Sequence, residues 1–181
     1  KAGANGSIAA SYVARSAPDG YTLFVTTNTT HSANPYLLKN MTYDPMKDFT
    51  PIARTGDLPF MLVIHPDIPA NSVAELIALA KKEPGKYSYA SGSSSAIVSG
   101  ATFARLAGID LLHVPYKSSP PALTDVIAGR VSMMFIDVPT GLPHVNAKAL
   151  KALAVTTKQP SALLPHLPTM DATVKGFDIT S

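Results

Sequence analysis

The chain has 181 residues, of which 46% are hydrophobic and 15% charged, and it contains no cysteine. This apolar content excludes a disordered chain, and no apolar run approaches the roughly 18 residues that a membrane helix needs. The missing cysteines exclude disulfides and thiolate metal sites. The net charge is +3, but the basic residues are dispersed, whereas nucleic-acid binding usually needs a clustered basic face. We therefore expect a globular protein that neither spans a membrane nor binds nucleic acid.

Strand-like and helix-like segments alternate along the chain. The predicted strands are residues 21–26, 60–65, 87–90, 111–115, 131–136 and 150–155. The predicted helices are residues 7–16, 72–82, 95–107, 119–128 and a short one at 139–146. The helix at 72–82 has the clearest end signals, because Ser72 and Glu75 form a capping box and Pro84-Gly85 follows the last turn. This alternation indicates an α/β fold with parallel strands.

The elements are unevenly distributed, which predicts two lobes. Residues 1–62 form a partial first lobe, residues 63–176 a second lobe, and residues 177–181 the start of a crossover back to the first lobe. We expect the strand at 60–65 to pass between the lobes. The first lobe holds one strand, one helix and a long irregular stretch at 28–51. If these 181 residues are expressed alone, we expect exposed apolar surface on this lobe, and hence association or domain exchange. The sequence at both ends indicates trimmed termini or a piece of a longer protein.

Three polar turns follow predicted strands, where parallel α/β sheets bind their ligands. They supply the candidate ligand contacts Thr27, Asn28, Thr30, His31, Ser91, Gly92, Ser93, Ser94, Ser95 and Asp137. The turn at 91–95 is the most informative, because it combines a glycine and four hydroxyls with the free N–H groups of a helix start, which favour an anion. The alternative for this turn, and for Asp137, is ordinary helix capping.

Catalytic and metal sites have weaker support. Residues 92–96 lack the second glycine of a G-x-S-x-G nucleophile elbow. A Ser/His/Asp triad of Ser94, one of the five histidines and Asp137 stays open, although no pairing signal favours it. The histidines are scattered without the spacing of metal ligands, and we expect His65 and His113 to be packed, hydrogen-bonded side chains. We therefore predict no catalytic residue, no metal and no cofactor.

Five motifs occur in one order along the chain. They are Ala17-Pro18-Asp19-Gly20-Tyr21-Thr22-Leu23, Tyr43-Asp44-Pro45-Met46-Lys47-Asp48-Phe49-Thr50-Pro51, Ser72-Val73-Ala74-Glu75-Leu76, Tyr89-Ala90-Ser91 and His113-Val114-Pro115-Tyr116-Lys117. Together they resemble the tripartite tricarboxylate transporter substrate-binding family, also called the Bug family. The resemblance implies a periplasmic, two-lobed solute receptor with a Venus-flytrap fold of type II. Such a receptor captures a small carboxylate and delivers it to the permease subunits of a membrane transporter.

The resemblance also implies that this chain lacks the family's N-terminal strand and C-terminal helices. Residues 27–31 match its first-lobe contacts, and residues 91–95 and the turn at Asp137 match second-lobe contacts. Three positions depart from the pattern: Ile97 stands where a polar residue is frequent, Ile136 where aspartate is frequent, and Ser118 where glycine is usual. These departures leave the ligand's identity open. A regulator's effector-sensing domain is the alternative, and an enzyme of unknown class comes third.

Overall fold

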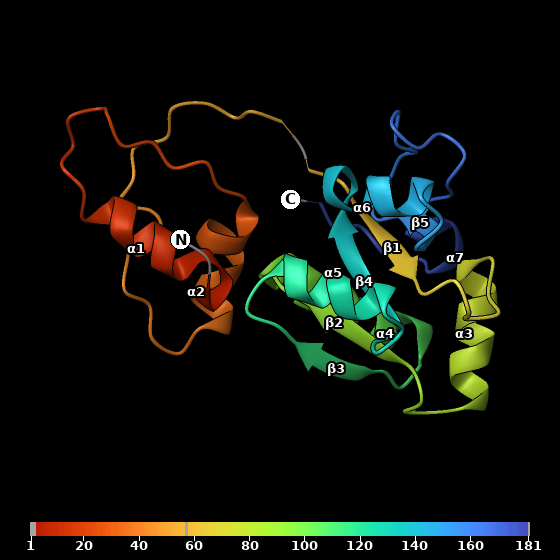
Figure 1. The fold of residues 1–181 in the computed structure, drawn as a ribbon. Coiled ribbons are helices and arrows are strands. Elements are labelled where there is room, and N and C mark those ends of the chain that lie inside the picture. The colour runs from red at the N-terminus through yellow and green to blue at the C-terminus, as the bar shows by residue number, and fades with distance from the viewer. Residues whose placement is uncertain (1–2, 57, 181) are drawn as a thin grey trace.

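The computed structural model describes residues 3–56 and 58–180. Residues 58–180 form one mixed sheet with helices on both faces (Figure 1). Its strands are β1 (Phe60–Ile64), β2 (Ser88–Ser91), β3 (Leu112–Pro115), β4 (Met133–Asp137) and β5 (Lys151–Val155). The helices of this region are α3 (Val73–Lys82), α4 (Ser94–Ala107), α5 (Ser119–Ile127), α6 (Val138–Asn146) and α7 (Met170–Thr173). The predicted α/β class is confirmed.

The strand order in the sheet is β3-β2-β4-β1-β5. Strand β2 is parallel to β3 and to β4, which confirms the three parallel strands predicted at 87–90, 111–115 and 131–136. Strand β1 is antiparallel to both of its neighbours. The sequence did not reveal this direction, because a continuous apolar run reads the same in a parallel or an antiparallel strand that is buried on both faces.

The position of β1 bears on the predicted lobes. All five of its residues pair with β4, so the predicted boundary after residue 62 falls inside a strand. The strand is an interior member of the sheet, and the expectation that residues 60–65 pass between two lobes stays a prediction. The division into lobes remains a prediction, and its outer limits, residues 1 and 181, lie outside the described residues.

The core has two layers, one on each face of the sheet, because successive side chains of a strand point to opposite faces. Leu62 and Phe135 face the first layer, where they join buried side chains of α3, α4 and α7. Met61 and Met134 face the second layer, where they join α5 and α6. This double coverage explains why β1 is apolar at every position, as its complete burial requires.

The N-terminal region, residues 3–56, has no such sheet. It contains η1 (Ala4–Gly6), α1 (Ser7–Ala14), η2 (Thr29–Ala33) and α2 (Asn34–Leu37). The last two elements lie in the stretch that we expected to be irregular. The predicted strand at 21–26 is wrong: the segment forms no strand, and Tyr21 and Val25 are 92% and 86% exposed. A strand needs a neighbouring backbone to satisfy its hydrogen-bonding groups, and residues 21–26 pair with no strand of the described sheet.

Exposed apolar side chains concentrate in this N-terminal region. It holds nine of the twelve large hydrophobic side chains that are exposed in the described part of the chain. These nine are Ile8, Tyr12, Tyr21, Leu23, Val25, Tyr36, Leu37, Met46 and Ile52. The prediction of exposed apolar surface is therefore confirmed for residues 3–56.

Candidate functional site

Three helices begin at one edge of the sheet. Helices α4, α5 and α6 follow the carboxyl ends of β2, β3 and β4, and this edge faces the N-terminal region (Figure 1). The hydroxyl of Ser93 accepts a hydrogen bond from the Ala96 N–H at 3.2 Å and caps α4. The carboxylate of Asp137 accepts one from the Thr140 N–H at 2.9 Å and caps α6. The capping alternative is thus confirmed for both residues, although capping occupies only one oxygen of the Asp137 carboxylate.

Gly92 lets the first turns of α4 and α5 approach each other closely. A Cβ atom at this position would lie 2.2 Å from the carbonyl carbon of Ser118 and 2.3 Å from the nitrogen of Ser119. Both are backbone atoms, which cannot rotate away as a flexible side chain can. Glycine at position 92 is therefore required by packing between two helix starts.

Two of the predicted contact segments meet directly. The hydroxyl of Ser95 donates to Asn28 Oδ1 at 3.0 Å and lies 3.1 Å from the hydroxyl of Thr29. The hydroxyl of Ser94 donates to Asn34 Oδ1 at 2.9 Å, and both residues are fully buried. Asn28 also donates from Nδ2 to the carbonyl of Thr180 at 2.7 Å. The start of α4 is therefore joined to residues 28–34 by its own side chains.

The other residues of the 27–31 segment have local partners. Thr27 is exposed, and its hydroxyl accepts from the Thr29 N–H at 3.4 Å. The hydroxyl of Thr30 is within hydrogen-bonding distance of His31 Nδ1, at 3.0 Å. The imidazole of His31 packs on the ring of Phe49 at 5.0 Å, and burial lowers the pKa of His31. His31 is thus part of an aromatic contact inside the N-terminal region.

Ser91 is bound to the neighbouring strand. Its hydroxyl lies 2.6 Å from Nε2 of His113 in β3, and the His113 ring stacks on Tyr89 at 4.7 Å. Burial lowers the pKa of His113. The prediction of a packed, hydrogen-bonded His113 is confirmed. The triad alternative is wrong, because Ser94 bonds to Asn34 and Asp137 caps α6.

Sequence analysis missed Asn34, a buried polar residue with hydrogen-bond partners in several segments. Asn34 lies in the stretch that was expected to be irregular, yet it begins α2 and bonds to Ser94. Its Nδ2 also lies 3.2 Å from the hydroxyl of Tyr43. The one available signal was Asn34-Pro35, a dipeptide that favours the start of a turn or helix. The contacts of its side chain depend on segments distant in sequence, so local pattern could not show them.

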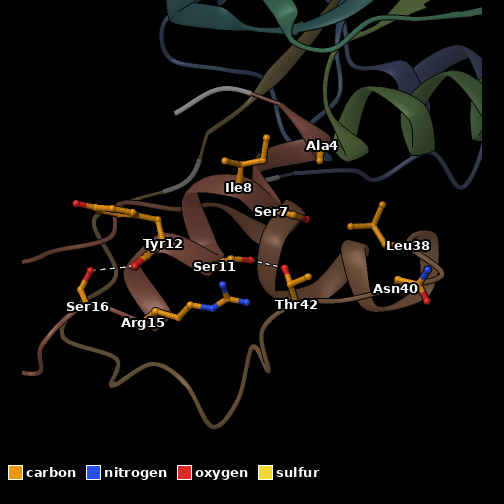
Figure 2. Close-up of a pocket in the computed structure, with 10 residues that line it drawn as sticks. All are labelled: Ala4, Ser7, Ile8, Ser11, Tyr12, Arg15, Ser16, Leu38, Asn40 and Thr42. Atoms are coloured by element: carbon orange, nitrogen blue, oxygen red, sulfur yellow. Dashed lines mark hydrogen bonds between the residues drawn. The ribbon is translucent and has the colours of Figure 1, made fainter.

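A groove of about 810 Å³ runs beside α1 (Figure 2). Its lining residues are Ala4, Ser7, Ile8, Ser11, Tyr12, Arg15, Ser16, Leu38, Asn40 and Thr42. None of them is a predicted ligand contact. Figure 2 shows the hydroxyls of Ser11 and Thr42 bonded across it, beneath the exposed side chains of Ile8 and Tyr12. The groove lies along a face of α1 that carries exposed side chains. Because no predicted ligand contact lines it, we keep the polar turns as the candidate site.

The polar turns consist mainly of neutral hydrogen-bonding groups. Within residues 3–56 and 58–180, no group of three or more histidine, aspartate or glutamate side chains is placed to hold a metal ion. No helix in the described part of the chain has the length and apolar character needed to cross a membrane.

A family model described as the tripartite tricarboxylate transporter family receptor matches residues 1–181. The chain belongs to this family. BugT of Bordetella pertussis is 33% identical over 173 residues, which cover 94% of this chain and 53% of BugT. A protein of the tcbD-tcbE intergenic region of Pseudomonas sp. strain P51 is 33% identical over 183 residues, which cover 99% of this chain and 54% of that protein. The chain spans about half the length of these curated relatives.

Solved structures support the same assignment. The periplasmic binding protein BugD matches with a TM-score of 0.91 and 33% identity, over 99% of this chain and 61% of that one. The R. palustris protein Rpa4515, solved with adipate, matches with a TM-score of 0.93 and 36% identity, over 97% of this chain and 60% of that one. MatC from Rhodopseudomonas palustris, solved with bound malate, has a TM-score of 0.87, 29% identity, and 98% and 62% coverage. The predicted family and fold are confirmed, and the family is one of receptors, not of enzymes.

Proposed function

We propose that the protein containing this chain is a periplasmic receptor that captures a small carboxylate and delivers it to the permease subunits of a tripartite tricarboxylate-type transporter. The observation that supports this most is the match of nearly the whole chain, with TM-scores of 0.93 and 0.87, to structures that hold adipate and malate. A receptor must bind and release its ligand unchanged. Neutral hydrogen-bond donors at the sheet edge suit that task better than a nucleophile with a base.

The proposed contacts are Thr27, Asn28, Thr30, His31, Ser91, Gly92, Ser93, Ser94, Ser95 and Asp137. The contact between residues 28–29 and Ser95 supports a site that both segments share. The hydroxyls of Ser94 and Ser95 already donate to asparagine oxygens. We therefore assign the anion to the backbone N–H groups of the first turn of α4, where the helix dipole favours negative charge, and assign the two hydroxyls to holding that turn in place.

Isothermal titration calorimetry on the full-length protein tests the ligand class. The titrants are adipate, malate, neutral sugars and amino acids. We expect heats of binding from a dicarboxylate and none from the neutral sugars. Binding of neutral sugars alone would overturn the proposed function.

A pair of matched variants tests the position of the site. Ser93 and Ser72 are both N-cap serines whose hydroxyls accept a backbone N–H at 3.2 Å, but Ser72 caps α3. Replacing either by alanine removes a cap of the same kind, typically about 1 kcal/mol of stability. Ser93→Ala is expected to weaken dicarboxylate binding by up to about tenfold, and Ser72→Ala to leave it unchanged. Equal affinities in the two variants would place the anion elsewhere without affecting the proposed ligand class.

The coding sequence upstream of this chain tests the cellular setting. A signal peptide there would support a periplasmic receptor, because export precedes residence in the periplasm. A helix-turn-helix segment in the same place would instead identify a transcription regulator with an effector-sensing domain.

A further inference from the structure

Asn34 is a fully buried side chain that joins three separate segments. Its Nδ2 lies 3.0 Å from the carbonyl oxygen of Asn5 and 3.2 Å from the hydroxyl of Ser7, at the start of α1. Its Oδ1 accepts from the hydroxyl of Ser94, at the start of α4, at 2.9 Å. The carbonyl of Asn5 can only accept, so Nδ2 must face it, and the orientation of the amide is thereby determined.

Tyr43 extends the same network. Its hydroxyl lies 3.2 Å from Asn34 Nδ2 and donates to the carbonyl of Thr30 at 2.7 Å. The hydroxyl therefore accepts from the amide and holds the backbone of η2. Ser7, Tyr43 and Ser94 are also buried, which makes each partner costly to remove, because a buried polar group left unpaired loses its full solvation.

The backbone that Asn34 holds is itself in an uncommon conformation. Ala4 and Asn5 have φ angles of 47° and 51°, in the left-handed region. Asparagine tolerates this region, but a residue such as Ala4 persists there only when the surrounding structure imposes the conformation. The bond from Asn34 Nδ2 to the Asn5 carbonyl is one such restraint.

We propose that Asn34 is a positioning residue for ligand binding: it holds residues 28–34 and the start of α1 at a set distance from the first turn of α4. This proposal rests on the proposed function, since both contact segments belong to the same carboxylate site. Asn34 need not touch the ligand. It acts through Ser94, from whose hydroxyl its Oδ1 accepts a hydrogen bond. It also acts through Thr30, because Tyr43 bonds both to the Asn34 amide and to the Thr30 carbonyl.

A double-mutant cycle in the full-length protein tests this role. The variants are Asn34→Leu, which has a similar volume and no hydrogen-bonding group, Ser94→Ala, and the two combined. Asn146→Leu is the matched control, because Asn146 is exposed at the end of α6. Adipate and malate affinities are measured by calorimetry, and unfolding free energies by urea denaturation.

Asn34→Leu is expected to weaken dicarboxylate binding by about tenfold to a hundredfold, and Ser94→Ala by up to about tenfold. In the Asn34→Leu background, Ser94→Ala should have no further effect, because the two act as one unit. Asn146→Leu should bind as the unchanged protein does. Fully additive effects of the two substitutions on affinity, or an unchanged affinity of Asn34→Leu, would overturn the proposal.

The urea measurements separate this proposal from the proposed function. Absence of dicarboxylate binding in the unchanged protein would refute the function, while the unfolding cycle would still report the Asn34–Ser94 coupling. Additive unfolding free energies would overturn the positioning role, and strongly non-additive ones would support the link on which it depends. If Asn34→Leu does not fold, Asn34→Ser replaces it in both cycles, because a serine hydroxyl is polar but too short to bridge the same partners.

Discussion

Two segments rich in apolar side chains differ in structure and burial in this molecule. Residues 60–64 form β1, which is buried at every position between β4 and β5. Residues 21–26 contain the same kinds of apolar and β-branched side chains, yet Tyr21, Leu23 and Val25 are 92%, 66% and 86% exposed. β-propensity expresses how a residue fits a pleated surface with neighbours. The comparison shows that neighbouring strands, not the residues themselves, decided which segment became a strand.

The two regions are also held by different forces. Residues 58–180 contain both hydrophobic layers of the sheet. Residues 3–56 are stabilised by a small aromatic cluster and by the hydrogen bonds of Asn34. In the cluster, Phe24 stacks on Phe49 at a ring distance of 5.6 Å. Regions with few buried apolar contacts open locally at lower free energy than a packed core. We therefore expect mutations of similar chemistry to differ in effect between the regions.

The largest contrast is expected between Phe135→Ala and Val25→Ala. Phe135 is buried between Phe103 and Phe177, at ring distances of 6.0 and 5.8 Å, so its truncation leaves a cavity. The expected loss in unfolding free energy is about 3–5 kcal/mol. Val25→Ala removes exposed atoms and should change stability by less than about 0.5 kcal/mol. Urea denaturation of both variants measures the difference, and similar losses would show that residues 21–26 are packed in solution.

A smaller loss is expected for Gly92→Ala. The added Cβ would meet the backbone of Ser118 at 2.2 Å, so α4 and α5 would have to separate, at a cost of about 1–3 kcal/mol. Gly108→Asn serves as the control, because Gly108 caps α4 in the left-handed conformation with open space around it, and asparagine tolerates that conformation. Thermal unfolding compares the two. Equal stability would mean that the helix starts adjust without strain.

The pH dependence of stability should come from both regions. Burial lowers the pKa of His113 and of His31 in the folded protein below the ordinary 6.5. The unfolded chain therefore binds more protons in this range, and stability falls as the pH drops below 6.5 towards the folded pKa values. Urea denaturation between neutral pH and pH 5 (about the lower end of this range) should show a shallower dependence for His113→Gln. An unchanged slope in this variant would contradict the assignment to His113.

The smallest effect on stability is expected from the double change Leu23→Ser and Val25→Ser. Both side chains are exposed, so the unfolding free energy should change by less than about 0.5 kcal/mol. Self-association of the chain should fall, because exposed apolar patches favour association. Sedimentation velocity measures this, with Leu163→Ser, an exposed position in the other region, as the control. Equal association of the control and the double variant would remove residues 21–26 as the cause.

The sequence by itself predicted the features whose causes lie close together in the chain. Ser72 with Glu75 predicted the start of α3, and the alternation of segments predicted five of the observed strands to within two residues at either end. The polar turns after β2 and β4 were placed correctly at the sheet edge. The order of short motifs was sufficient to indicate the family that the whole-chain match confirms. Caps, turns and apolar runs are local signals, so a linear reading recovers them.

The tertiary structure alone decided the direction of β1, the unpaired state of residues 21–26 and the partners of Ser94 and Ser95. Sequence reasoning assigned those two hydroxyls to a ligand, whereas they bond to Asn34 and Asn28, which lie 60 and 67 positions earlier in the chain. Strand direction and side-chain partnership depend on which distant segments the core brings together. The free energy of burying apolar surface depends on which segments pack together in the folded layers, and a local sequence pattern does not specify those partners.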